Sequence, residues 1–155
     1  MKTLVQYYHN CVTKIENLKS IILLFIRLVL AYGFYQPAKL KWADIGSIID
    51  WFKTLGIPAP ALNAYLAAST EAAGVVLLIL GLGTRIITIP LMITMLVAIK
   101  TVHWANGFEA GNNGFEIPLY YLLMLFILLV YGGGKFSIDQ LLNRKYRKTP
   151  NLTLS

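Results

Sequence analysis

The chain has 155 residues, of which 57% are hydrophobic and only 14% are charged, against about 25% charged residues in an average soluble domain. Its mean hydropathy of +0.62 excludes an ordinary water-soluble domain and predicts an integral membrane protein. The single cysteine, Cys11, cannot form an intrachain disulfide or a cysteine metal cluster, so thiol chemistry within one copy is not expected. The net charge of +7 arises mainly from the two ends of the chain, which indicates anionic membrane lipids as partners and not nucleic acid.

Four apolar segments are long enough to cross a bilayer, which takes about 20 residues in a helix. In chain order, the predicted spans are residues 20–38, 62–82, 86–105 and 117–134. The expected fold is all-α, an integral membrane antiparallel four-helix bundle. This divides the chain into an N-terminal cytoplasmic or interfacial segment (1–19), a four-span membrane domain (20–134) and a basic cytoplasmic tail (135–155).

Two shorter helices are predicted outside the spans. In the first long loop, apolar residues recur at helical spacing over residues 45–56, which predicts a short interfacial helix on the outer membrane surface. After the fourth span, Ser137 and Gln140 fit a capping box for a short helix in the tail.

The distribution of basic residues predicts the orientation. The termini and the turn that contains Arg85 lie on one side and carry nine lysines and arginines, whereas the two long loops carry four. By the positive-inside rule, both termini are cytoplasmic and the protein lies in the inner membrane of a prokaryote.

Two charged residues fall near the middle of the predicted spans, Arg27 in the first and Glu71 in the second. A charge near the bilayer centre costs at least about 2.5–3.5 kcal/mol, so such side chains face the protein interior and find partners. We therefore predict a structural ion pair between Arg27 and Glu71.

Other polar residues gather toward the outer ends of the spans. Tyr32, Gln36 and Lys39 share a helix face, as do Lys100 and His103, and Glu116 and Tyr120. Together they predict a ligand-binding cavity near the outer surface, with Glu71 at its floor. The candidate residues are Gln36, Lys39, Glu71, Lys100, His103, Glu116 and Tyr120.

Each of these residues has a second interpretation. The Arg27–Glu71 pair can be purely structural, the lysines can extend to the interface as anchors, and His103 beside Trp104 suits an interfacial aromatic belt. No metal site is predicted, because no His-x-x-x-His or Glu-x-x-His spacing is present. No residue is assigned a catalytic role.

Three segments, IRLVLAYGFYQPAKL, STEAAGVVLLILGLGTR and GFEIPLYYLLMLFILLVYGGGKFSID, together resemble the DoxX family of small four-helix membrane proteins. The resemblance covers about residues 24–141. It rests on an arginine early in the first span, a lysine that closes it, and a glutamate in the second span followed by G-L-x-T-R. The matched motif positions are Arg27, Lys39, Glu71, Arg85, Glu116 and Asp139, with His103 matched more loosely.

The family takes its name from a subunit associated with a terminal quinol oxidase and thiosulfate:quinone oxidoreductase of archaea. The resemblance thus implies a quinone- or quinol-interacting subunit of a membrane oxidoreductase complex, with quinone as the bound cofactor. Since the chain has no cofactor motif, electrons would come from a redox partner protein or directly from a reducing substrate. The alternative is a non-enzymatic membrane scaffold or small-molecule binding partner. Whether the protein is an enzyme, and whether it forms homo-oligomers, stays open.

Overall fold

A computed structural model describes the backbone of residues 2–147 and the side chains of residues 18–144, and every regular element in it is a helix. Side chains of the predicted N-terminal segment before residue 18 and of the tail after residue 144 lie outside the described residues. The elements are α1 (Lys2–Ala43), α2 (Ile45–Thr54), α3 (Pro60–Leu80), α4 (Thr84–Ala98), the π-helical η1 (Ile99–His103), the 3₁₀ turns η2 (Trp104–Asn106) and η3 (Ala110–Asn112), α5 (Glu116–Tyr131) and α6 (Ile138–Arg147).

Three helical stretches are long and apolar enough to cross a membrane: Leu18–Ala43, Pro60–Leu80 and Thr84–Asn106. The fourth apolar helix, α5, has 16 residues and is shorter than these. The first stretch differs from the sequence prediction, because α1 continues through Pro37 to Ala43 and does not end at residue 38. A proline inside a membrane helix is tolerated where neighbouring groups compensate the lost hydrogen bond.

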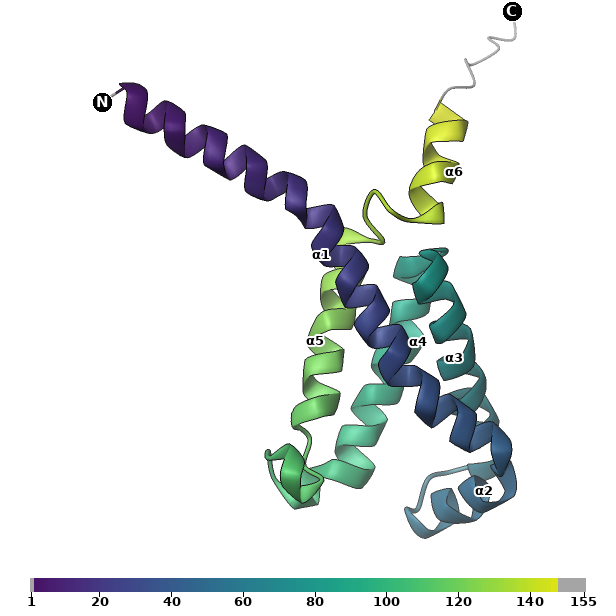
Figure 1. Cartoon of the computed structure of the whole chain (residues 1–155). Helices are drawn as coiled ribbons and strands as arrows, with labels where there is room; N and C mark the ends of the chain where they lie inside the picture. Colours follow the sequence, from purple (N-terminus) through teal and green to yellow (C-terminus); the bar gives the residue numbers. More distant parts are fainter. Residues whose placement is uncertain (1, 148–155) are drawn as a thin grey trace, which may run out of the picture.

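The long helices run alternately up and down beside one another (Figure 1). Helix α1 crosses diagonally in front and contacts α3 and α5, while α4 contacts the same two helices. Helix α2 and the connection between α4 and α5 lie at one end of the molecule, and α6 and the turn between α3 and α4 lie at the other (Figure 1). We call these the α2 end and the α6 end.

Both short helices begin at a residue whose side chain caps them. The Asp44 side chain accepts a hydrogen bond from the Ser47 backbone N–H and so caps α2. At the start of α6, the backbone N–H of Gln140 donates to the Ser137 hydroxyl oxygen at 3.3 Å. The predicted tail helix is thus present, and a helix is present in the first long loop.

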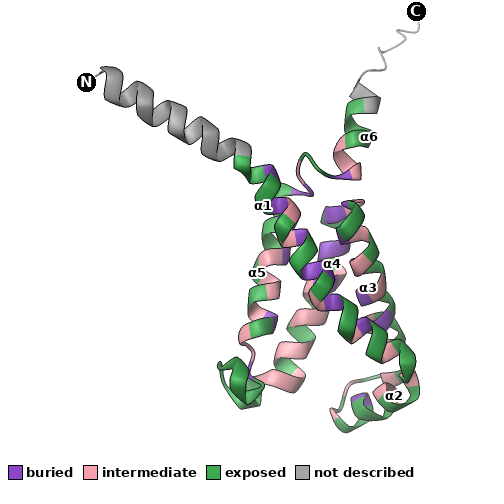
Figure 2. Cartoon of the chain, viewed as in Figure 1, coloured by how far each residue is buried: buried purple, intermediate pink, exposed green. Residues whose placement is uncertain are grey.

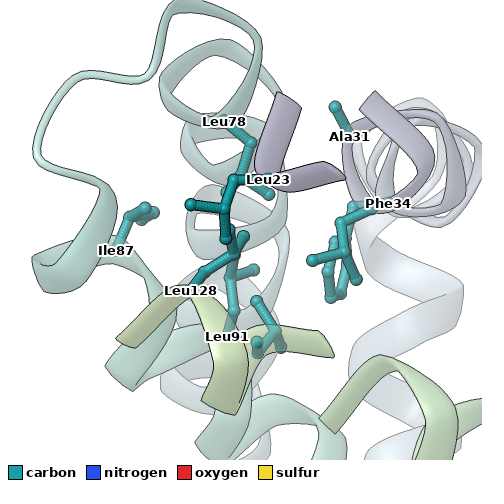
Figure 3. Packing of buried hydrophobic residues seen from close by; sticks show 9 residues of the cluster. Leu23, Ala31, Phe34, Leu78, Ile87, Leu91 and Leu128 are labelled. Atoms are coloured by element: carbon teal, nitrogen blue, oxygen red, sulfur yellow. The ribbon is translucent and has the colours of Figure 1, made fainter. Parts of the chain in front are cut away.

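A leucine-rich core joins all four long helices. Figure 3 shows Leu23 and Phe34 from α1 meeting Leu78, Leu91 and Leu128 from the other three helices. Many large apolar side chains point the other way and are exposed, including Phe25 at 63% and Ile86 at 76% (Figure 2). A soluble monomer rarely exposes apolar surface on this scale, and lipid contact on the outward faces accounts for it. The chain is therefore an all-helical membrane protein.

Candidate functional site

Among the residues whose side chains are described, Glu71 has the most deeply buried carboxylate, and this carboxylate binds the ammonium group of Lys41. The Lys41 Nζ atom donates to both carboxylate oxygens, at 2.8 and 3.0 Å. The Glu71 side chain is 3% exposed and that of Lys41 is 16% exposed. Two hydrogen bonds to one carboxylate satisfy two of the three ammonium protons, so one N–H of Lys41 is left for a further acceptor.

This pair joins α1 to α3 within the apolar part of the molecule. Lys41 belongs to the last turn of α1, and Glu71 lies near the middle of α3. One residue after Lys41, the indole N–H of Trp42 donates to the Ala68 carbonyl oxygen at 3.2 Å. The Trp42 ring also makes an edge-on contact with Tyr65. These contacts hold the end of α1 against α3.

A crevice of about 240 Å³ lies between α1 and α3 beside the ion pair. Helix α1 supplies Tyr35, Ala38, Lys39 and Trp42, which form one stripe at helical spacing, and α3 supplies Ala72 and Val75. Val75 lies one turn from Glu71, and Ala38 lies one turn from Lys41, so the crevice borders the pair. Small alanines at its floor and aromatic rings beside them suit a flat apolar group.

The predicted pair between Arg27 and Glu71 is wrong. Arg27 is 1% exposed and donates to four backbone carbonyl oxygens. These are Leu78 and Ile79 at 2.7 Å each, and Gly133 and Phe136 at 2.9 Å each. The carbonyls in the last turn of a helix have no partner within the helix, and their partial negative charge attracts a cation. Arg27 therefore caps α3, while Glu71 lies further toward the α2 end and binds Lys41.

Two other motif positions also join helix ends, so with Arg27 they form a clamp at the α6 end, defined here as Arg27, Arg85 and Asp139. The Asp139 carboxylate accepts the backbone N–H groups of Gly83 and Thr84, at 2.7 and 3.0 Å, and thereby caps the start of α4. The Arg85 guanidinium donates to the Val130 carbonyl oxygen at 2.9 Å near the end of α5. The clamp residues thus have structural roles.

The predicted outer cavity does not assemble from all of its candidate residues. Gln36, Lys39, Lys100 and Tyr120 are exposed, and among these Lys39 lines the crevice. Gln36 lies nine residues after buried Arg27, which is about two and a half helical turns and places it on the opposite side of α1. Gln36 therefore faces away from the core, contrary to the prediction.

The connection between α4 and α5 holds the remaining candidates. A His103 ring nitrogen lies 2.8 Å from the Asn113 carbonyl oxygen. The Glu116 carboxylate accepts the Tyr120 hydroxyl at 2.9 Å and the Ala110 backbone N–H at 3.0 Å. The expected common face of Glu116 and Tyr120 is thus present, but these contacts order the connection itself.

The residue that sequence reasoning missed is Lys41, because the first span was expected to end at residue 38. A signal for it exists in the spacing. Arg27, Phe34 and Lys41 are seven residues apart, and positions seven residues apart fall on nearly the same face of a helix. If the first predicted helix is extended to residue 43, this spacing places Lys41 on the same face as Arg27 and Phe34, which are buried.

Comparison with known proteins finds a matching family profile and several bacterial relatives. The sequence profile of the DoxX family matches residues 22–104, which include Arg27, Lys41 and Glu71. A Haemophilus influenzae protein named only as uncharacterised is 32% identical over 86% of this chain and 91% of its own length. A Bacillus subtilis protein named "Putative oxidoreductase CatD" is 32% identical over 73% of this chain and 80% of its own length.

A third relative, an uncharacterised membrane protein of Mycobacterium tuberculosis, is 35% identical over 61% of this chain and 64% of its own length. No solved structure matches the chain. The family profile covers more than half of the chain, and two of these relatives are at least 30% identical over most of their own length. The chain therefore belongs to the DoxX family of membrane proteins.

Proposed function

We propose that this protein is a quinone- or quinol-interacting subunit of a membrane oxidoreductase complex, and that its quinone site is the crevice beside Lys41 and Glu71. The observation that supports this is a buried ion pair that borders an apolar crevice with aromatic walls. A quinone ring needs an apolar slot together with a hydrogen-bond donor or acid at its carbonyls. The crevice would supply the slot, and the neighbouring Lys41–Glu71 pair would supply the donor and the acid. The oxidoreductase name of the Bacillus subtilis relative is consistent with the proposal.

The two residues of the pair would have different roles. The N–H of Lys41 that does not bind Glu71 donates to a quinone carbonyl oxygen. Reduction of a quinone to a quinol takes two electrons and two protons, and Glu71 exchanges protons with the ring oxygens. Lysine and glutamate carry no electrons, so a redox partner protein or a reducing substrate supplies them.

We also propose that the chain crosses the membrane four times. The α6 end is then cytoplasmic, and the α2 end lies outside with α2 on the outer membrane surface. The 16 residues of α5 span about 24 Å, so the glycines at 132–134 would complete its crossing of a hydrocarbon core of about 30 Å. A Cys11→Ser background that carries Lys2→Cys or Asn112→Cys should react with a membrane-impermeant thiol reagent from opposite sides. Reaction of both from one side would contradict this topology.

Organic extraction of the purified protein followed by mass spectrometry tests the proposed ligand. Wild-type protein should retain quinone in preference to bulk lipid, and both Lys41→Met and Glu71→Gln should lose it. Lys53→Met is the matched control, because Lys53 forms a 2.7 Å ion pair with Asp50 in which both side chains are exposed. Equal quinone content in Lys41→Met and Lys53→Met would contradict the assignment of the site.

The alternative is a non-enzymatic scaffold, and the bidentate contact between Lys41 and Glu71 favours it, because that contact pins α1 to α3. Under this alternative, Glu71→Gln lowers the melting temperature and wild-type protein extracts contain only bulk lipid. Under the proposed function, folded Glu71→Gln protein still lacks quinone. The two measurements together distinguish the functions.

A further inference from the structure

The outward face of α1 carries a continuous stripe of exposed side chains that includes a polar one. Its apolar members are all between 49% and 79% exposed: Leu18, Ile22, Phe25, Val29 and Tyr32. Gln36 follows at the same spacing and is exposed as well. The steps between consecutive members alternate between four and three residues. We call these six residues the α1 seam.

The spacing of the α1 seam is that of a heptad repeat, in which two positions per seven residues face a partner helix. Ile22, Val29 and Gln36 occupy one of these positions, and Leu18, Phe25 and Tyr32 occupy the other. In parallel two-stranded coiled coils, isoleucine and valine are favoured at the first position, as at Ile22 and Val29, and leucine is favoured at the second, as at Leu18. A polar residue at a single first position fixes the register and the number of helices.

Lipid tails cannot form hydrogen bonds with the side-chain amide of Gln36. The residue lies opposite Arg27 on α1, about two turns before the end of the helix, and thus faces outward from the core. An amide has two donor hydrogens and an acceptor oxygen, and hydrocarbon offers partners for none of them. Apolar side chains alone give no preference for a helix over lipid tails, so the amide distinguishes this face from the other lipid-facing surfaces.

We propose that the α1 seam is the interface of a homodimer, in which the Gln36 side chains of two copies hydrogen-bond to each other. All copies insert into the membrane in the same orientation, so a two-fold axis along the membrane normal brings two α1 helices together in parallel. That symmetry places the two Gln36 amides at the same depth, where each can donate to the other and accept from it. The side chains before it then pack in heptad register. This interface does not depend on a bound quinone.

Cysteine cross-linking tests the interface in native membranes. In a Cys11→Ser background, Gln36→Cys should form a disulfide-linked dimer when a membrane-permeant oxidant is added. The matched control is Ala73→Cys, since Ala73 is exposed on α3 next to crevice residue Ala72 and so lies at a similar depth. The control should stay monomeric. Cross-linking of both variants to a similar extent, or of Gln36→Cys only to a different protein, would overturn the proposal.

Energy transfer between labelled copies in liposomes tests the role of the amide. Gln36→Leu should weaken dimerisation about five- to thirtyfold, which corresponds to the loss of an intramembrane hydrogen bond of about 1–2 kcal/mol. Gln36→Asn should keep most of the affinity, because it keeps the amide. Both variants should keep the melting temperature of the wild-type monomer, because the Gln36 side chain is exposed and lies outside the core. Undiminished dimerisation of Gln36→Leu would contradict the proposed contact.

Discussion

Replacement of Arg27 by methionine should destabilise the protein by about 4 kcal/mol. The substitution keeps a long side chain in the buried space but removes the donors to four backbone carbonyls. The hydrogen bonds to Leu78 and Gly133 are fully buried, and a buried acceptor without a donor costs about 1–3 kcal/mol. The other two acceptors are partly exposed and can bind water. Two orphaned carbonyls thus give a range of about 2–6 kcal/mol.

The assay is reversible unfolding in mixed micelles of a mild detergent and sodium dodecyl sulfate. Arg85→Met serves as the matched control, because Arg85 donates one exposed hydrogen bond to Val130 and its loss should cost less than about 1 kcal/mol. Arg27→Lys should lie between the wild type and Arg27→Met, since an ammonium group has three donors for four acceptors. If Arg27→Met unfolds at the same detergent fraction as Arg85→Met, the assigned role of Arg27 as a helix cap is refuted.

Two further changes test the packing and the capping. Gly81→Ala should unfold at a lower denaturant fraction than the wild type, because Gly81 has φ +65° and an added Cβ would lie 2.6 Å from Ser137. Gly111→Ala, where nothing lies within 4 Å, should behave like the wild type, and equal losses would contradict the clash. Hydrogen bonds from the Ser47 hydroxyl and backbone N–H hold the pKa of Asp44 below its usual value. Its capping contribution is therefore complete above the unfolded pKa of about 3.9 and is lost as the pH falls through the lower folded pKa. At neutral pH, Asp44→Ala should reproduce the change in α2 that acid causes, with Trp51 fluorescence as the measurement.

The long apolar segments and their order were predictable from the sequence. A run of about 20 apolar residues bounded by turn residues indicates a membrane helix largely without reference to tertiary contacts. The cap of α6 at Ser137 was predictable for the same reason, because it depends on residues three positions apart. Such local patterns require no knowledge of the neighbouring helix.

The pairing of the intramembrane charges was not predictable in the same way. The expected Arg27–Glu71 pair assumed that depth follows from position within an apolar run, and that the first span ends at residue 38. Because α1 continues to Ala43, Lys41 reaches Glu71, and Arg27 lies level with the end of α3. The four carbonyls that bind Arg27 come from two separate segments, so no pattern within one segment reveals them.

The most direct test of the proposed function is titration of lipid-nanodisc protein, depleted of endogenous quinone, with a water-soluble short-chain quinone, followed by tryptophan fluorescence. Trp42 lines the crevice, so binding should quench its emission in a saturable manner. Lys41→Met should weaken binding about ten- to hundredfold, the value of a charged hydrogen bond of about 1.5–3 kcal/mol, while Lys53→Met should bind like the wild type. Non-saturable quenching of the wild type, or equal affinity in the two lysine variants, would contradict a quinone site at Lys41 and Glu71.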